Sequence, residues 1–345
     1  MKKLKFLEID GSFGEGGGQI LRTAITLSCI MKQPINIENI RKNRKKPGLK
    51  PQHLTSLSIL KKICNADVGQ IKIGDTSLKF IPGHVKSINL KENVGTAGSI
   101  SLIFQVLIPV IAFCQKKLKL TIIGGTSVLW SPTIDYTQIV LREVYLRMGI
   151  NCSINIIKRG YYPKGGGIVE LEVLPTKKIN SIALNTRKTK NAKLICTFSK
   201  LPFELINNQI KNIKKKLIEN NFIVETKFNE EPTLDSGSSL MISSIDNDSI
   251  IGIDSLFNIK TKTFDLDLDK FIDNNLSVDE YLADMLVLPA SLARGTTIFQ
   301  VPNISKHLET NLFVASKITG CKYGIGKLKN GYEIRIEGIS YTNIK

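Results

Sequence analysis

The residues best suited to nucleophilic chemistry lie in the segment 301–312, centred on His307, one of only three histidines in 345 residues. The run before it has the alternation of a strand, and apolar residues after it recur at helical spacing. Ser305 is a suitable N-cap, so His307 is expected in the first turn of a helix. The positive end of the helix dipole disfavours imidazolium there, which leaves the neutral ring that a nucleophile needs. A histidine simply packed at a helix start is the ordinary alternative.

A glycine-rich turn, Gly14-Glu-Gly-Gly-Gly-Gln-Ile-Leu-Arg22, precedes another predicted helix. Such a turn lets backbone N–H groups approach an anion, although a turn of this kind is more often a plain helix start. It has neither the Gly-Lys-Ser/Thr of a Walker A loop nor the spacing of a dinucleotide fingerprint. Glu15 is unusual in this turn, because a carboxylate beside an anion site needs a cation between them. Glu15 is therefore the candidate ligand for Mg²⁺ or Mn²⁺.

Arginines follow the glycine turn at Arg22, Arg41 and Arg44. Their guanidinium groups suit phosphate oxygens, because two N–H groups can bind two oxygens at once. The lysines at positions 42, 45 and 46 beside them indicate a solvated face or a contact with an RNA backbone.

Two polar residues interrupt otherwise apolar predicted helices, Gln105 in the first half of the chain and Asp284 in the second. A buried amide or carboxylate needs a partner. Gln105 would serve an adenine edge or a ribose, and a hydrogen bond between helices is the alternative. Asp284 needs a cation or an amide.

The composition is that of a globular protein, with 42% hydrophobic residues, and the net charge of +18 favours a polyanionic partner, most simply nucleic acid. A generally basic composition without function would produce the same charge. The six cysteines form no Cys-x-x-Cys pair and mostly lie in apolar runs, which indicates buried free thiols in a reducing compartment. The N-terminus has no secretory h-region, and the most apolar stretch (103–114) is too short to span a bilayer. A cytoplasmic protein without membrane contact is expected.

The chain repeats one order of elements three times: strand, helix, strand, helix and hairpin. The first unit is predicted to close with a hairpin of 70–73 and 78–81, the second to open with a strand at 87–90, and the third to open with a strand at 264–268. In this repeat His53 and His307 both fall at the start of a second helix. A repeated histidine is either structural or evidence that two units supply one site.

The third unit comes about a hundred residues later than the spacing of the first two predicts, which indicates a domain-sized insertion. We therefore predict an α/β (α+β layered) fold with a three-repeat catalytic domain over 1–182 and 264–345. A smaller inserted α/β domain is expected over 183–263, with an outer boundary as far as 276. Its predicted helix carries lysines at 211, 214, 215 and 216, which fit either a solvated face or an RNA contact.

Together, the glycine turn, the segment 40–53 with Arg41, Arg44, Gln52 and His53, and the motifs Arg159-Gly-Tyr-Tyr-Pro-Lys-Gly-Gly-Gly167, Tyr281-Leu-Ala-Asp284 and Ser305-Lys-His307-Leu resemble the RNA 3′-terminal phosphate cyclase family. The resemblance runs from end to end, and the segment 159–167 is highly specific to that family.

The resemblance implies an ATP-dependent ligase of RNA processing that converts an RNA 3′-phosphate to a 2′,3′-cyclic phosphate, through adenylylation of His307. By matching position, it implies phosphate contacts for Arg22, Arg41 and Arg44, a catalytic pocket with Gln52 and His53, and a metal site at Glu15. The implied adenylate pocket consists of Gln105, Pro132, Tyr281, Leu282, Ala283, Asp284 and Met285. The family commonly has glutamine where this chain has Met285.

Two alternatives share this architecture. Cyclase-like proteins that act without catalysis in ribosomal RNA processing lack the nucleophilic histidine, whereas His307 is present here with its flanking motif. An enolpyruvyl-transferase-like enzyme would need neither His307 nor the segment 159–167.

Overall fold

The computed structural model describes residues 4–84, 89–114 and 117–342 and has a mixed α/β architecture of layered sheets and helices. The first unit comprises β1 (Leu7–Asp10), α1 (Gly18–Met31), β2 (Ile35–Glu38), α2 (Pro51–Cys64) and β3 (Leu78–Phe80). The second comprises β4 (Leu90–Asn93), α3 (Ile100–Ala112), β5 (Leu118–Gly124), the helical run α4 (Ile134–Tyr136), η1 (Thr137–Leu141) and α5 (Arg142–Arg147), β6 (Cys152–Lys158) and β7 (Gly167–Val173). The third contains α8 (Glu280–Leu292), β13 (Thr296–Val301), α9 (Lys306–Thr319), β14 (Lys322–Leu328) and β15 (Gly331–Glu337).

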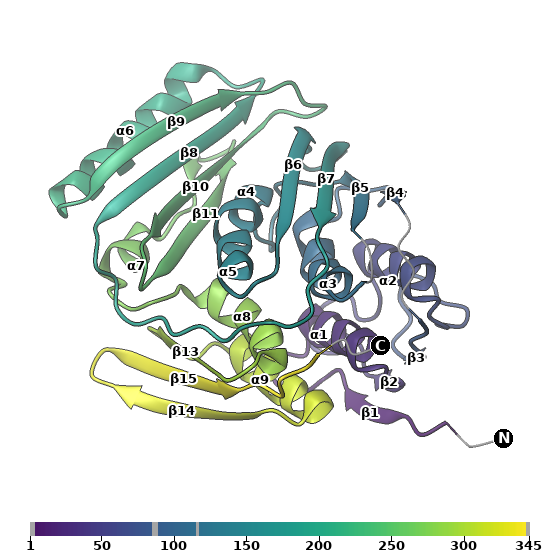
Figure 1. Cartoon of the computed structure of the whole chain (residues 1–345). Helices are drawn as coiled ribbons and strands as arrows, with labels where there is room; N and C mark the ends of the chain where they lie inside the picture. Colours follow the sequence, from purple (N-terminus) through teal and green to yellow (C-terminus); the bar gives the residue numbers. More distant parts are fainter. Residues whose placement is uncertain (1–3, 85–88, 115–116, 343–345) are drawn as a thin grey trace.

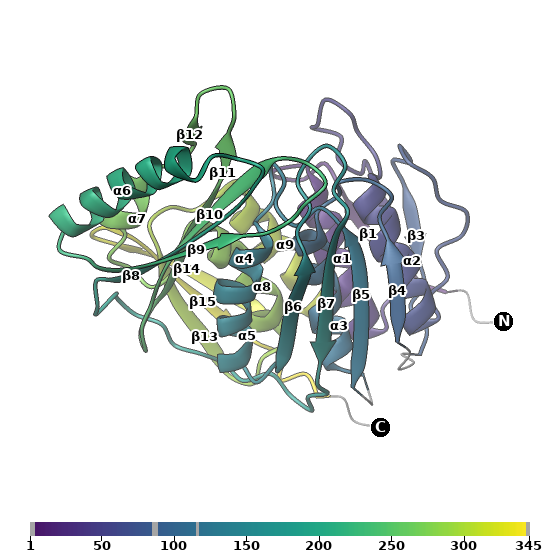
Figure 2. The same ribbon diagram turned by 90° about the horizontal axis from the view of Figure 1, so that it is seen from above.

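Each unit has its own small sheet, and the helices gather between the sheets (Figures 1 and 2). The sheet orders are β1-β2-β3, β4-β5-β7-β6 and β13-β15-β14. Helix α1 contacts both α3 and α9, and α8 contacts α9, so helices of all three units meet in one apolar core. Helix α3 is buried almost all round, which explains why its sequence is apolar throughout rather than on one face.

The strand expected at 264–268 to open the third unit is wrong. Phe264 belongs to the short β12 (Thr263–Phe264), which pairs with β11 (Ile250–Asn258), and Leu268 begins α7 (Leu268–Asp273). Both side chains pack into the core of the inserted region, which the alternating sequence pattern could not reveal.

The opening-strand position of the third unit is instead filled by the chain before the insertion. Ala183 lies parallel to Ile298 of β13, with hydrogen bonds from Leu184 N to Ile298 O (2.8 Å) and from Ile298 N to Ile182 O (2.9 Å). In the other units the first strand is likewise parallel to the second. The inserted region therefore separates the first strand of the third unit from its first helix.

The inserted region is a five-stranded sheet of order β12-β11-β10-β8-β9. Its remaining elements are β8 (Asn191–Ser199), α6 (Phe203–Glu219), β9 (Ile223–Glu230) and β10 (Gly237–Ile245). A second apolar cluster, running from Ala192 to Ile272, holds it together. On α6, Lys216 forms an ion pair with Asp269 of α7 (2.6 Å) and Lys215 lies 3.9 Å from Glu219, as on an ordinary charged helix face. The division at 183 and 263, or 276, stays a prediction.

The expected first-unit hairpin is also only partly present. Residues 70–73 are not a strand, and β3 pairs with β2, while a single bridge joins Asp67 to Ile81. The turn between 73 and 78 is bonded instead to Leu49, which directly follows the basic segment 41–48, here called the basic loop. Leu49 N donates to Asp75 O (3.0 Å), and Gly74 N donates to Leu49 O (3.0 Å). Residues 87 and 88 of the strand expected at 87–90 lie outside the described residues, and β4 begins at Leu90.

The segment Arg159–Gly167 connects the second unit to the inserted sheet. The Arg159 guanidinium forms a buried two-pronged ion pair with Asp135 and a further contact with Glu231 (3.1 Å). The Tyr161 hydroxyl donates to Thr197 O (3.3 Å), and its ring lies against Gly237, where any Cβ would collide with it. All six cysteines are buried and free. Among the helices of the described ranges, none is both long and apolar enough to cross a membrane.

Candidate functional site

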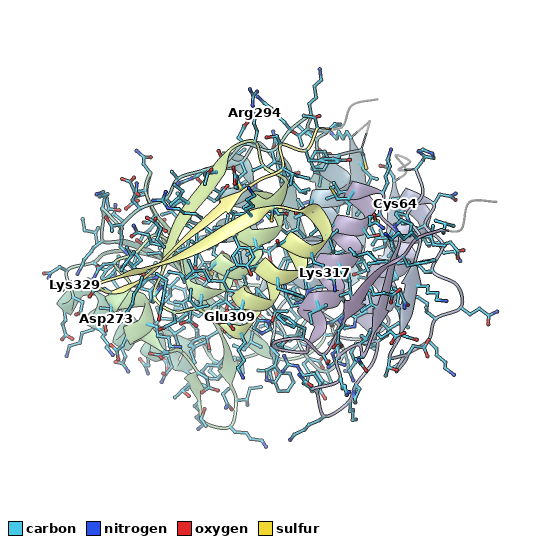
Figure 3. The ribbon with its side chains drawn as sticks, turned by 90° about the horizontal axis from the view of Figure 1, so that it is seen from below. Cys64, Asp273, Arg294, Glu309, Lys317 and Lys329 are labelled. Atoms are coloured by element: carbon cyan, nitrogen blue, oxygen red, sulfur yellow. The ribbon has the colours of Figure 1, made fainter. Side chains whose placement is uncertain are left out.

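The site forms where the glycine turn of the first unit meets the start of α9 in the third. Glu15 N donates to the Thr310 hydroxyl (3.1 Å), and that hydroxyl donates to Lys306 O (2.6 Å). Gly14 has φ +57°, and a Cβ there would lie 2.3 Å from the Thr310 hydroxyl, so the close approach needs glycine. In Figure 3, Lys317 of α9 lies beside the N-terminal unit, and Glu309 is labelled near the other end of the same helix. Two segments about 300 residues apart thereby become neighbours.

His307 lies in the first turn of α9, as expected, with its Nδ1 3.8 Å from Glu15 Oε2. The cap is Ser305, which accepts from Leu308 N (2.9 Å) and donates its hydroxyl proton to Asp284 (2.7 Å). Partial burial lowers the pKa of His307, and the positive charges of Arg22 and Arg44 lower it further. The expected neutral imidazole is thus supported by desolvation and by two guanidinium groups, in addition to the helix dipole.

Glu15 is a buried carboxylate, and the cation that pairs with it in this structure is Arg44. Within the described ranges, no residue donates a hydrogen bond to either of its oxygens. Among the described residues, no three His, Cys, Asp or Glu side chains group into a metal site. Mg²⁺ commonly uses one or two carboxylates together with substrate phosphates and water, so a single acid of this kind fits a metal that arrives with a nucleotide.

Arg22 and His53 line the other side of the glycine turn. A Cβ on Gly18 would lie 3.0 Å from His53 Nε2 and 3.1 Å from Arg22 Nη1, so both side chains approach this glycine. Arg22 donates to Gln19, but its Nε has no partner in the part of the chain that the structure describes, and burial lowers the pKa of Arg22 to about 10. A buried guanidinium with an unused donor is ready to bind an anion.

Arg41 is turned into its own loop, where Nη1 donates to Lys46 O (2.8 Å) and Gly48 O (3.0 Å). This arrangement shapes the basic loop, although Arg41 is near enough to lower the pKa of Arg22 and of His53. The Gln52 side chain accepts from Ser99 N (3.3 Å) and so connects the first unit to the start of α3.

A small cavity of about 20 Å³ lies between α1, α3 and α8, lined by Gln19, Arg22, Thr23, Gln105, Tyr145, Asp284, Met285 and Leu288. Gln105 Nε2 donates to Met285 Sδ (3.3 Å), which is the helix-to-helix alternative for this amide. Asp284 is bonded by a hydroxyl rather than by a cation, and burial raises its pKa to about 8. Arg22 opposes that rise only weakly.

The other residues expected in an adenylate pocket do not line this cavity. Tyr281 is 56% exposed and makes an edge-to-face contact with Tyr136 (centroids 6.3 Å apart), while Pro132 is half-buried just before the N-cap of α4. Leu282 and Ala283 are wholly buried in the apolar core, which leaves no free side-chain face for a ligand.

Two residues that sequence reasoning missed, Thr310 and Asn311, hold the site together. Thr310 orients Glu15, and Asn311 joins α1 to α8 because its amide donates to Asp284 O (2.9 Å) and its carbonyl accepts from the Thr23 hydroxyl (2.7 Å). Thr310 follows His307 by three residues and Asn311 by four, a spacing that places side chains on one helix face. That spacing was the signal in the sequence that could have identified them.

Comparisons with known proteins show the family of this chain. The family model for RNA 3′-terminal phosphate cyclase matches residues 13–325. Relatives with the name RNA 3′-terminal phosphate cyclase include those of Pyrobaculum aerophilum (35% identical, covering 97% of this chain and 99% of the relative) and Methanosarcina barkeri (37%, covering 96% and 99%). A third, from Pyrococcus abyssi, is 37% identical over 91% of this chain and 93% of its own length.

These similarities define the class as well as the family. The chain has the layered repeat fold and the end-to-end similarity of an enzyme class that acts on RNA 3′ ends. It belongs to the RNA 3′-terminal phosphate cyclase family.

Proposed function

We propose that this protein converts an RNA 3′-terminal phosphate to a 2′,3′-cyclic phosphate in three steps driven by ATP. The proposal rests on the family membership and on one observation above all: His307, with a lowered pKa, lies beside Glu15, Arg22 and Arg44 at a helix N-terminus. A neutral imidazole among cationic groups suits nucleophilic attack on a phosphate.

In the first step, the free Nε2 of His307 attacks the α-phosphorus of ATP, and the bond to the β-phosphate oxygen breaks to release pyrophosphate. Nδ1 faces Glu15, which leaves Nε2 as the attacking nitrogen. Arg22, with its unused Nε donor, and Arg44 would neutralise charge that develops on the phosphates. A divalent ion held by Glu15 would supply Lewis-acid stabilisation.

In the second step, an oxygen of the RNA 3′-phosphate attacks the AMP phosphorus and the His307 N–P bond breaks. In the third, the vicinal 2′-OH attacks the 3′-phosphorus, loses its proton and expels AMP, which closes the cyclic phosphate. Arg41, Gln52 and His53 are proposed to position the phosphates. Gln105, Pro132 and the segment Tyr281–Met285 are proposed to border the adenylate, with the buried Leu282 and Ala283 contributing backbone atoms only.

We further infer that the protein works in the cytoplasm with RNA as its polyanionic partner. The six buried free thiols suit a reducing compartment, and the charge of +18 suits a phosphodiester chain.

The test is to incubate the protein with α-³²P-labelled ATP and a divalent metal, then to run a denaturing gel, for wild type and His307→Ala. Label that is acid-labile, alkali-stable and absent from the variant would establish the histidine-AMP bond. No label in either folded protein would favour the non-catalytic role in ribosomal RNA processing. Label retained in His307→Ala would mean that another residue is the nucleophile.

A further inference from the structure

Four exposed apolar side chains form a surface at the end of the second sheet, which we call the aromatic rim: Leu129, Trp130, Tyr162 and Leu234. Trp130, the only tryptophan of the chain, is 95% exposed, and Tyr162 is 74% exposed. Single exposed apolar residues are common, but a nearly bare tryptophan next to a bare tyrosine is not, because aromatic side chains gain much from burial.

The turns that carry the rim are joined by backbone contacts. Ser127 lies beside Tyr161 in a parallel bridge, and Thr126 N donates to Gly160 O (2.9 Å). The turns that carry Trp130 and Tyr162 therefore leave the sheet next to each other. Leu234 approaches from the inserted region, since a Cβ on Gly166 would lie 2.6 Å from Leu234 Cδ1.

The backbone holds Trp130 outward at an energetic cost. Its φ is +61°, in the left-handed region that bulky residues rarely occupy and that costs roughly 1–2 kcal/mol. Hydrogen bonds fix the turn on both sides, from Ile134 N to Thr126 O (2.7 Å) and from the Ser131 hydroxyl to Val128 O (3.1 Å). Strain of this kind gathers at ligand clamps and functional turns.

The rim borders the candidate site on two sides. Pro132 follows Trp130 by two residues, and the adjacent helix α4 carries Tyr136, which contacts Tyr281. On the other side Gly125 N donates to Gly98 O (2.9 Å), and the next residue, Ser99, donates its N–H to Gln52. The turns of the rim are thus connected to two segments of the candidate site, at Tyr281 and at Gln52.

The charges around the rim suit a polyanion. Lys164 has a side chain 67% exposed, with its Nζ 3.8 Å from Asp235 Oδ1, and Lys200 Nζ donates to Leu234 O (2.8 Å), so both ammonium groups lie at its edge. The acids that face it are already engaged: Asp235 accepts from Lys164 N (2.8 Å), and Glu231 contacts buried Arg159.

We propose that the aromatic rim binds the unpaired nucleotides just upstream of the RNA 3′-phosphate, whose bases stack on Trp130 and Tyr162. This inference rests on the proposed function and adds the path of the substrate. Exposed aromatic faces edged with lysines bind single strands by stacking and charge, with little preference for sequence.

Because the chain has a single tryptophan, fluorescence excited at the red edge of the tryptophan absorption band, where tyrosine does not absorb, reports on Trp130 alone. The full-length protein is titrated without ATP with a short single-stranded oligoribonucleotide that ends in a 3′-phosphate. An abasic ribose-phosphate oligomer of equal charge is the matched control. Quenching by the RNA, but not by the abasic oligomer, is the expected result. If labelled RNA binds by anisotropy while Trp130 fluorescence stays unchanged, the inference is overturned.

A second measurement uses variants. Tyr162→Ala is expected to raise the Kd for the oligoribonucleotide by roughly 5- to 100-fold, the range for loss of one stacking contact. Tyr162→Phe keeps the ring and should bind like wild type, and so should Tyr323→Ala, an exposed tyrosine of β14 in the third unit. Equal affinity of Tyr162→Ala and wild type would assign the rim to another partner.

Failure of this inference can be told apart from failure of the proposed function. Labelling of His307 by ATP needs no RNA, so normal labelling together with an unresponsive Trp130 would overturn the rim alone. Absent labelling in wild type, with Trp130 still quenched by RNA, would overturn the nucleophile and leave the rim standing.

Discussion

The two histidines at the starts of α2 and α9 occupy almost the same place in the repeated unit but have opposite surroundings. His53 is 3% exposed, and its Nδ1 accepts from Lys50 N (3.1 Å), the residue that caps its own helix. His307 is half-exposed, and its Nδ1 faces Glu15 on a different unit. The first ring is bound within its own helix, and the second is turned toward other parts of the chain.

A shift of one residue accounts for much of the difference. His53 is the third residue after its cap and His307 the second after Ser305. One residue turns a side chain by roughly 100° around a helix. From the third position a side chain can reach back to the cap N–H, as in a capping box. In α9 that position is held by Leu308, which is buried, so His307 points toward the glycine turn. A repeat can therefore carry a structural and a reactive histidine at nearly one position.

The largest expected effect separates the two histidines by chemistry. His307→Asn should abolish labelling by α-³²P-ATP, with a loss of more than roughly 10³-fold, because the attacking nitrogen is gone. His53→Asn should leave labelling detectable though slower, because His53 is proposed only to position phosphates. The measurement is the initial rate of label incorporation at saturating ATP. Equal losses in the two variants would show that the distinction between these histidines is wrong.

The reverse pattern is expected for stability. His53→Ala should lower the free energy of unfolding by about 2–4 kcal/mol, because it leaves a cavity and an unpaired Lys50 N–H. His307→Ala should change it by less than about 0.5 kcal/mol, as is usual for a partly exposed side chain. Urea unfolding followed by circular dichroism measures both. A His307→Ala variant that is less stable than His53→Ala would contradict this assignment.

The pH dependence of stability sharpens the comparison further. Burial lowers the pKa of His53 from 6.5 to about 3, and the positive charges of Arg22, Arg41 and Lys50 add to this. His53 therefore binds a proton below pH 6.5 in the unfolded chain but only near pH 3 in the native state. The contribution of neutral His53 to the free energy of unfolding is fully present above pH 6.5. It falls as the pH drops below 6.5, by about 1.4 kcal/mol per pH unit.

The test compares wild type with His53→Gln, which keeps an acceptor for Lys50 N. At pH 5, protonation of His53 in the unfolded state should lower the free energy of unfolding of wild type by about 2 kcal/mol relative to the variant. The buried carboxyls of Asp254 and Asp279, whose pKa values burial raises to about 6, oppose this trend but are common to both proteins. Parallel stability curves between pH 4 and 7 would mean that His53 is not held neutral.

The smallest effect concerns the contact that brings Glu15 to His307. Thr310→Val removes the acceptor for Glu15 N and should cost about 1 kcal/mol of stability. It should also slow labelling roughly tenfold, because Glu15 is held less firmly. Thr310→Ser retains the hydroxyl and is the matched control. Unimpaired labelling in Thr310→Val would remove Thr310 from the positioning of this site.

The sequence alone determined the local features of this protein. Period and turn residues located most helices and strands, because amphipathic spacing and helix caps act within a few residues. The cap at Ser305, the first-turn position of His307 and the arginines near the glycine turn could all be read without a structure.

Only the tertiary structure decided which segments meet. The alternating residues 264–268 fit a strand of the third unit equally well, but burial of Phe264 and Leu268 placed them in the inserted region. Likewise, no local pattern shows that Thr310 receives Glu15 N, or that Met285 accepts from Gln105. Such contacts join residues 295 and 180 positions apart. They form because burying a shared core outweighs what each segment prefers by itself.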